Sequence, residues 1–232
     1  MKILFLMMAG KGTRLGNKIP KQFLEIGDQP VYKSILDLYS TSSLIDRVVI
    51  VNNPDWMSYV ESQVNDDAYP FEISIIKGGE TRSASIQNAV KFVNSSLELS
   101  DDSVVLIHDA THPYLDTKAC GEVISLIADR YKAATVVTHV WDTVYESEDG
   151  EVSRTLNREN IAVGASPEAF RWDFLKGIYL VERDLSQFTS AGNYAKQVGE
   201  KIGIVWSSKI NLKITYPDDL RLYTSALNYF KD

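Results

Sequence analysis

The chain has 232 residues and a formal net charge of −7, with 44% hydrophobic and 24% charged residues. This composition is typical of a globular protein with one sizeable core. The negative charge argues against general nucleic-acid binding, so any anion site must be a local basic cluster.

The one cysteine, Cys120, excludes an internal disulfide and favours a reducing compartment. It falls in an expected helix, where it is a small core residue. No apolar run has the length of a membrane span and no signal-peptide pattern follows the first one, so we expect a cytoplasmic protein without membrane contact.

The chain opens with a short apolar run, residues 2–8, that predicts a buried strand leading into a loop with Gly10, Gly12 and Gly16. Exposed backbone N–H groups beside basic side chains form a cradle for phosphate. The alternative is an ordinary strand-to-helix turn with solvated charges. The spacing G-x-G-x-x-x-G is not that of the dinucleotide fingerprint, and the G-K-[ST] of a P-loop is missing. We therefore expect a nucleotide held by a different fold family.

Strand and helix patterns alternate along the first 140 residues. Strands are expected at 2–8, 47–51, 71–76, 104–107 and 135–140, and helices at 31–40, 55–64, 83–93 and 117–131. This alternation predicts a Rossmann-like α/β fold, with one mostly parallel twisted sheet covered by helices on both faces. A nicotinamide-dependent oxidoreductase is disfavoured, because the second strand ends in Asn52-Asn53 and not in an acidic ribose ligand. No repeat or linker divides the chain, so residues 1–232 are expected to form one domain.

Residues 141–160 interrupt this alternation. Asp149-Gly150 lies between runs containing Val144 and Val152, which predicts a β-hairpin with its turn at this pair. A two-stranded ribbon is marginally stable alone, so the hairpin either projects as a dimerisation arm or folds back onto its own domain. Beyond it, the pattern predicts helices at 172–184 and 218–230 and a short strand at 203–206.

Several segments in a fixed order indicate a family resemblance. They are Ala9-Gly10-x-Gly12-x-Arg14 with Pro20-Lys21-Gln22, Gly-Gly-Glu-Thr-Arg-Ser-Ala-Ser-Ile at 78–86, His-Asp-Ala-Thr-His-Pro at 108–113, Asp142-Thr143, and Asn-Leu-Lys-Ile-Thr at 211–215 followed by Pro-Asp-Asp-Leu at 217–220. Over nearly the whole chain they resemble the sugar nucleotidyltransferases, most of all the cytidylyltransferases that act on methylerythritol phosphate or ribitol phosphate. The resemblance implies a homodimer that transfers CMP from CTP to a small phosphorylated acceptor, with Mg²⁺ and release of pyrophosphate.

In such a reaction a phosphate oxygen of the acceptor attacks the α-phosphorus of CTP. Because the attacking group is already an anion, no general base is needed, and catalysis depends on positioning two polyanions and neutralising their charge. By resemblance, Arg14 and the loop amides hold the β- and γ-phosphates, Lys21 contacts the α-phosphate, and Lys213, on an expected strand at 212–215, touches the phosphates. The alternatives are structural salt bridges for Arg14 and Lys21 and a solvent-facing position for Lys213.

Nucleotide-binding residues are expected where strands end, at the carboxyl edge of the sheet. By resemblance, Gly78, Gly79, Glu80 and Ser85 recognise the cytosine. The same resemblance gives nucleotide contacts to Ala9, Gly10, Gly12, Asp109 and Ala110. The structural alternative for the segment at 78–85 is a turn in which Ser83 caps the following helix and Arg82 stabilises the loop. Asp109 ends the strand at 104–107, where a carboxylate suits Mg²⁺; the alternative is a cap on the following turn, and His108 is given no catalytic role.

The acceptor-binding positions depart from the resembled family. His112 stands where the family generally has arginine, and it offers a conditional charge and no bidentate fork. Thr143 and Arg158 match the family's pair that reaches across the dimer to the acceptor phosphate, but no lysine follows Asp142-Thr143. The family patterns Thr-Pro-Gln-x-Phe and Thr-Asp-Asp or Thr-Asp-Glu appear here as Ser-Pro-Glu-Ala-Phe at 166–170 and Thr-Ser-Ala at 189–191.

The chain keeps the family's triphosphate-binding residues, whereas its acceptor-binding residues differ from the family pattern. This combination predicts the same nucleotide chemistry on a different acceptor, such as ribitol 5-phosphate. Methylerythritol 4-phosphate is the alternative acceptor. A nucleotide-binding subunit without turnover is a further hypothesis, and the presence of both Arg14 and Lys21 counts against it.

Overall fold

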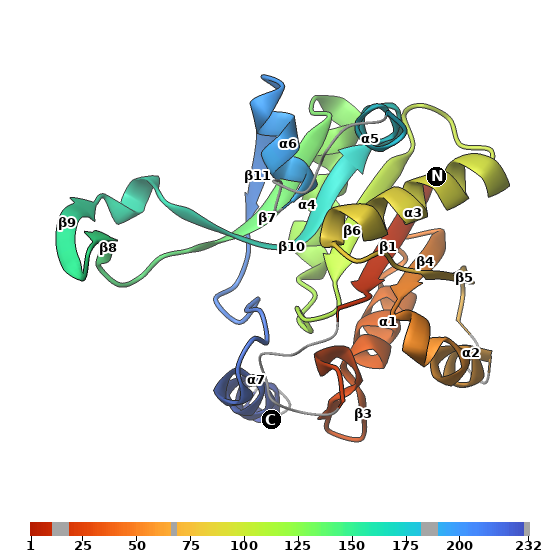
Figure 1. Ribbon diagram of the computed structural model, residues 1–232, viewed down its shortest axis with the longest axis horizontal. Helices are drawn as coiled ribbons and strands as arrows, with labels where there is room; N and C mark the ends of the chain where they lie inside the picture. Colours follow the sequence, from red (N-terminus) through yellow and green to blue (C-terminus); the bar gives the residue numbers. More distant parts are fainter. Residues whose placement is uncertain (11–18, 66–68, 182–189, 230–232) are drawn as a thin grey trace.

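A seven-stranded sheet forms the centre of the protein (Figure 1), and the computed structural model describes residues 1–10, 19–65, 69–181 and 190–229. The strand order is β11-β7-β10-β6-β1-β4-β5. In chain order these strands are β1 (Lys2–Met8), β4 (Arg47–Asn52), β5 (Glu72–Lys77), β6 (Val104–Asp109), β7 (Ala133–His139), β10 (Ala162–Arg171) and β11 (Ile202–Trp206). β10 runs antiparallel between β6 and β7, and the other strands are parallel. The mostly parallel sheet predicted from the alternation is thereby confirmed.

Helices cover both faces of the sheet, as expected. One face packs against α1 (Val31–Ser42), α2 (Met57–Asn65) and α4 (Thr117–Asp129), and the other against α3 (Arg82–Ser96), α5 (Trp172–Tyr179) and α6 (Ala191–Gln197). α7 (Pro217–Tyr229) lies away from the sheet in Figure 1 and adds Tyr223 to the first core. β1 contributes Leu4 and Leu6 to the first core and Ile3 and Phe5 to the second. This division explains its unbroken apolar run, because a central parallel strand is buried on both sides.

Cys120 lies fully buried in α4, with its Sγ 4.0 Å from the Tyr39 hydroxyl oxygen. Burial raises the pKa of its thiol to about 12, so the residue is a core side chain, as expected. None of the helices formed by the described residues is both long and apolar enough to cross a lipid bilayer.

Three expectations from the sequence need correction. No strand is predicted from the sequence at β10; this strand contains Pro167, which cannot donate a ladder hydrogen bond, and its register against β7 shifts between Gly164 and Glu168 around this proline. The short helix α6 was also not expected. Residues 212–215 form no strand, because the backbone N–H groups of Thr215 and Tyr216 donate to the Asp219 carboxylate at 2.8 and 2.7 Å instead of joining a ladder.

Smaller elements complete the fold. They are the 3₁₀ turns η2 (Lys21–Phe23), η3 (Pro54–Trp56) and η4 (Arg158–Asn160), and the two-residue strands β2 (Glu25–Ile26) and β3 (Gln29–Pro30). α3 begins one residue earlier than expected, with Thr81 as its N-cap in place of Ser83. The helix expected at 172–184 ends as α5 at Tyr179, and residues 182–184 lie outside the described part of the chain.

The predicted hairpin consists of β8 (Val144–Glu148) and β9 (Glu151–Leu156), which form a sheet of their own. Its turn has positive φ angles at Asp149 (50°) and Gly150 (86°), the combination that a type I′ turn requires. Figure 1 shows the hairpin projecting from the body of the protein beyond β7 and β10. The hairpin therefore does not fold back onto its own domain, which was the alternative that the sequence left open.

The order of the strands places the ligand site. From β1 at the centre, the chain first builds β4 and β5 on one side and then β6, β7 and β11 on the other. The connections therefore diverge between β1 and β6, and in open α/β sheets such a switch point leaves a crevice at the carboxyl ends of the strands. Ala9 follows β1 at this point and Asp109 ends β6.

Candidate active site

The glycine pair after β5 packs tightly against the end of β1. A Cβ atom on Gly78 would overlap the Cβ of Ala9 and lie 3.1 Å from the Ser85 Oγ. A Cβ on Gly79 would lie 2.6 Å from the Cβ of Ala84. Only glycine fits at these two positions. Ala9 and Ser85 therefore both pack directly against Gly78, as expected from the sequence.

Ser85 holds this turn in place. Its Oγ accepts a hydrogen bond from the Gly79 N–H at 3.0 Å and donates one to the Thr81 carbonyl at 2.9 Å. Glu80 is exposed beside the turn. Ser85 therefore ties the turn to the start of α3, while the glycines let the turn approach Ala9 and Ala84 closely.

The segment after the glycine-rich loop returns to the end of β1. The buried Gln22 amide donates to the carbonyls of Met8 at 2.6 Å and Gly10 at 3.0 Å. No role is predicted for Gln22 from the sequence, although its position directly after Lys21 in the motif indicates that it lies close to the site. Gly12 and Arg14 lie outside the described residues, so their predicted roles stay predictions.

Lys21 reaches the C-terminal part of the chain, 194 residues away. Its Nζ donates to the Thr215 carbonyl at 2.5 Å, and the side chain is largely buried. Lys213 is two residues from this contact. Lys21 therefore contacts the segment that carries Lys213, which is irregular and not a strand.

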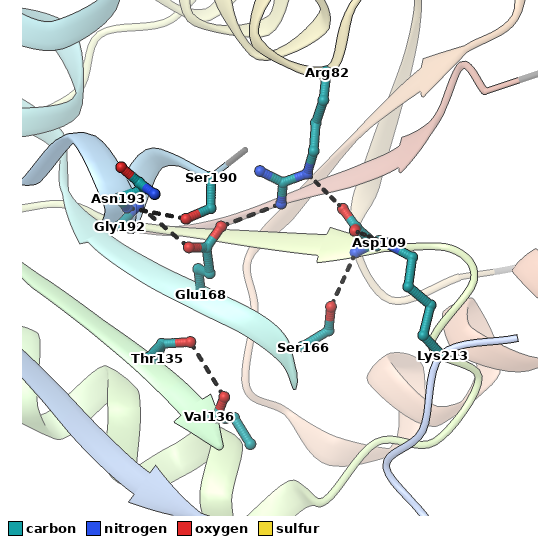
Figure 2. Close-up of polar contacts among 10 residues, drawn as sticks. All are labelled: Arg82, Asp109, Thr135, Val136, Ser166, Glu168, Ser190, Gly192, Asn193 and Lys213. Atoms are coloured by element: carbon teal, nitrogen blue, oxygen red, sulfur yellow. Dashed lines mark hydrogen bonds and ion pairs between the residues drawn. The ribbon is translucent and has the colours of Figure 1, made fainter. Parts of the chain in front are cut away.

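Four charged side chains converge at the end of β6 (Figure 2). Asp109 accepts from the Arg82 Nε on Oδ1 and from the Lys213 Nζ on Oδ2, both at 3.0 Å. Arg82 also donates from Nη2 to the Glu168 Oε2 at 3.1 Å. Burial alone would raise the pKa of the Asp109 carboxyl, but the charges of Arg82 and Lys213 outweigh this effect and hold the pKa well below its usual range. Asp109 therefore stays ionised.

His112 is a buried neutral imidazole. Its Nδ1 lies 3.3 Å from the Oδ1 of Asn211, and burial together with the neighbouring His108 lowers the pKa of His112 to about 4. The charge that the sequence left conditional is therefore absent near neutral pH. His108 is structural, as expected: its Nε2 lies 2.7 Å from the His112 carbonyl oxygen and its Nδ1 lies 3.0 Å from the Tyr39 hydroxyl.

Asn211 and Ser166 support the end of β6, and sequence reasoning predicted neither contact. The Asn211 amide donates to the Ser166 carbonyl at 2.9 Å, and the Ser166 Oγ accepts from the Asp109 N–H at 3.3 Å. On the other side of Asp109, the buried Ala110 donates its N–H to the Met7 carbonyl at 2.9 Å. These contacts join β1, β6 and β10 around the site.

A cavity of about 930 Å³ opens beside this cluster. Its polar lining comes from Arg82, Asp109, His112, Glu168, Ser190, Asn193, Lys196, Gln197, Lys209, Asn211 and Lys213, among others. Thr143 and Arg158 are not among the described residues that line this cavity. Both are exposed at the base of the hairpin, where the Arg158 Nη1 donates to the Trp141 carbonyl at 2.6 Å. The structure therefore does not bring these two predicted acceptor-binding residues to the site of their own chain.

Comparisons with known proteins show which family the chain resembles. The family model of IspD, 2-C-methyl-D-erythritol 4-phosphate cytidylyltransferase, matches residues 3–228. The 2-C-methyl-D-erythritol 4-phosphate cytidylyltransferase of Thermotoga neapolitana is 36% identical over 222 residues, which cover 96% of this chain and 95% of the relative. The ribitol-5-phosphate cytidylyltransferase of Lactiplantibacillus plantarum is 27% identical over 225 residues, 96% of each chain.

Solved structures show the same fold. The 4-diphosphocytidyl-2C-methyl-D-erythritol synthase of Anaerococcus prevotii has a TM-score of 0.77 at 22% identity and covers 98% of both chains. A family model that spans nearly the whole chain, together with a relative above 30% identity, settles the membership. This chain belongs to the IspD family of CTP-dependent cytidylyltransferases.

Proposed function

We propose that this protein transfers CMP from CTP to a small polyol phosphate. 2-C-Methyl-D-erythritol 4-phosphate is the first acceptor, because the family model and the relatives at 33% and 36% identity carry that name. Ribitol 5-phosphate is the second acceptor. It is supported by His112, which is neutral and differs from the expected arginine, and by the relative at 27% identity.

Basic residues from three distant segments, two of them on Asp109 and the third on the segment that carries Lys213, support this proposal. Arg82 and Lys213 flank Asp109, and Lys21 lies beside the segment that bears Lys213. An oxygen of the acceptor phosphate attacks the α-phosphorus, the bond from this phosphorus to the bridging oxygen breaks, and pyrophosphate leaves with the electron pair. No proton has to move. Lys21 and Lys213 neutralise the charge that gathers on the phosphoryl oxygens.

The nucleotide lies along the bare edge that Gly78 and Gly79 form, with Ser85 beneath it. Ala9, Gly10 and Ala110 border the same switch point, and Glu80 is exposed next to the glycine pair, within the part of the molecule where a cytosine amino group would be recognised. The predicted contribution of Gly12 and Arg14 is to hold the β- and γ-phosphates.

Asp109 is the residue suited to Mg²⁺. No group of three or more His, Cys, Asp or Glu side chains that could hold a metal occurs in the described part of the chain. A single carboxylate fits Mg²⁺ when the remaining ligands are triphosphate oxygens and water. When bound, the ion would neutralise the triphosphate and orient it; Arg82 and Lys213 keep the Asp109 carboxylate ionised for this role.

We also propose that the protein acts as a homodimer in which the hairpin completes the partner's site. Trp141, Tyr145 and Val152 are 58%, 56% and 60% exposed on or beside the hairpin, an apolar surface suited to a second copy of the chain. Thr143 and Arg158 at its base would then approach the acceptor phosphate in the partner subunit, which agrees with their absence from the cavity of their own chain.

Pyrophosphate release with CTP, Mg²⁺ and a panel of phosphorylated acceptors tests the proposal. Turnover with methylerythritol 4-phosphate but not ribitol 5-phosphate is expected, and the reverse preference would move the second acceptor to first place. CTP binding in calorimetry without turnover on any acceptor would contradict the proposed reaction and favour a binding subunit.

A further inference from the structure

Glu168 occupies an unusual place for a carboxylate. It lies on β10, inside the sheet, and its side chain is 11% exposed in the wall of the cavity. A buried carboxylate is costly unless each oxygen finds a donor. The contacts of its two oxygens therefore show what the residue does.

Each oxygen of Glu168 holds a different element. Oε2 accepts from the Arg82 Nη2 at 3.1 Å, at the start of α3, and Oε1 accepts from the Gly192 N–H at 3.2 Å, in the first turn of α6. A Cβ atom on Gly192 would lie 2.9 Å from the same Oε1. The absence of a side chain at Gly192 and the carboxylate of Glu168 are thus fitted to one another (Figure 2).

Through these contacts one side chain joins the two parts of the site. On one side, α6 presents Asn193, Lys196 and Gln197 to the cavity. On the other side, Arg82 bonds Asp109, which in turn bonds Lys213. Arg82 uses Nε for Asp109 and Nη2 for Glu168, so Glu168 ties α6 to Arg82 through a nitrogen that the Asp109 contact does not use.

The strand order separates Glu168 from the base-binding edge. Gly78 follows β5 on one side of the switch point, whereas Glu168 lies on β10 on the other side, next to β7 and α6. A change at Glu168 therefore acts on the β7–β10 side of the site. His112, a predicted acceptor-binding residue, lines the same cavity as Glu168, so under the proposed function this is the side on which the acceptor binds.

We propose that Glu168 is a positioning residue for the acceptor: by holding α6 and Arg82 together it shapes the acceptor wall without contributing to CTP binding. This inference rests on the proposed function. A structural ion pair would behave differently, because its loss would lower the stability of the whole protein and weaken both substrates together.

The first test is Glu168→Gln. Arg82 and the Gly192 N–H donate to different oxygens of Glu168, and glutamine replaces one of these oxygens by an NH2 group, so one of the two donors loses its acceptor. We expect the KM for the acceptor to rise about tenfold or more with a smaller change in kcat. The dissociation constant of CTP, measured by calorimetry, should stay within about twofold of the wild type. Glu200→Gln is the matched control. Glu200 forms an ion pair with Lys132, with 2.5 Å between Oε1 and Nζ, and neither residue lines the cavity. This variant should leave the acceptor KM unchanged.

A second variant, Gly192→Ala, tests the same contact from the other side. The added methyl group pushes Glu168 and α6 apart, so this variant should also raise the acceptor KM. Because both changes break one contact, the double variant should be no worse than the more impaired single variant. Additive effects would contradict action through this contact.

Two further outcomes overturn the proposal. One is an acceptor KM of Glu168→Gln within about twofold of the wild type. The other is a parallel loss of acceptor affinity, CTP affinity and thermal stability, which a merely structural role predicts. The wild type is assayed first with both acceptors, so absence of turnover there is recognised as failure of the proposed function, and it removes this inference as well.

Discussion

At the scale of single residues, the site depends on charges that burial and neighbours have already settled. Asp109 is held ionised by two cations, His112 is held neutral by burial, and Lys21 is largely buried with its ammonium on the Thr215 carbonyl. None of these states has to change during phosphoryl transfer. Preorganised charge of this kind costs no reorganisation in the transition state.

Lys21→Ala should lower turnover by about 10²- to 10³-fold, because its ammonium acts most strongly on charge that develops in the transition state. The dissociation constant of CTP should change much less. Steady-state pyrophosphate release and calorimetry separate the two quantities. Lys176→Ala, which removes a lysine paired with Asp101 outside the site, is the control. Unchanged turnover in Lys21→Ala would remove this residue from the chemistry.

His112 should make the protein less stable in acid. The unfolded chain protonates this side chain as the pH falls through about 6.5, whereas in the folded chain its pKa is lowered to about 4. Between these two values the unfolded state binds more protons, so the free energy of unfolding falls with falling pH. The loss is on the order of 3 kcal/mol at a single site.

Urea unfolding of the wild type and of His112→Gln at pH 7.5 and pH 4.5 measures this effect. The variant lacks the titrating group and should lose less stability over the same range. Equal losses in the two proteins would show that His112 is protonated alike in the folded and unfolded states. His108, whose pKa is also lowered by burial, is present in both proteins and cancels.

At the scale of elements, close packing of backbone shapes the edge at which we propose that the nucleotide binds. The end of β1, the turn after β5 and the first turn of α3 meet without intervening side chains at Gly78 and Gly79. Local rules account for each element separately: the Thr81 side chain caps α3, and an apolar run forms β1. The absence of side chains at Gly78 and Gly79 is what lets these elements meet.

Gly78→Ala should destabilise the protein by about 1–3 kcal/mol, because the new methyl group overlaps Ala9. CTP affinity should fall as the edge deforms. Gly177→Ala is the matched control: this glycine lies within α5 with no atom within 4 Å of an added Cβ, so the change should stabilise the helix by about 0.5–1 kcal/mol. Urea unfolding compares the two, and a Gly78→Ala protein as stable as the wild type would contradict the tight packing.

At the scale of the whole molecule, the site of one chain lacks the residues on its own hairpin. Arg158 and Thr143 lie at the base of an arm that projects from the body (Figure 1), and a homodimer is the arrangement that would return them to a site. Symmetry then gives each dimer two equivalent shared sites.

Mixtures of two inactive variants test this assembly. Lys21→Ala and Arg158→Ala chains, refolded together, should regain about a quarter of wild-type activity, because half of the dimers are mixed and each holds one intact site. Lys21→Ala mixed with Lys213→Ala should regain nothing, since both residues serve the same chain's site. Absence of recovery in the first mixture would exclude a shared site.

Features that depend on near neighbours can be predicted from the sequence. The buried run of β1, the type I′ turn at Asp149 and Gly150 and the glycine pair after β5 follow from residue volume, side-chain period and allowed φ angles. Long-range contacts emerge only on folding: β10 enters the sheet antiparallel, Glu168 joins Arg82 across 86 residues, and Lys21 meets Thr215. Such contacts depend on the order of the strands, which no local pattern encodes. The state of His112 was decided in the same way, because its pKa follows from burial and from neighbours that only the folded chain supplies.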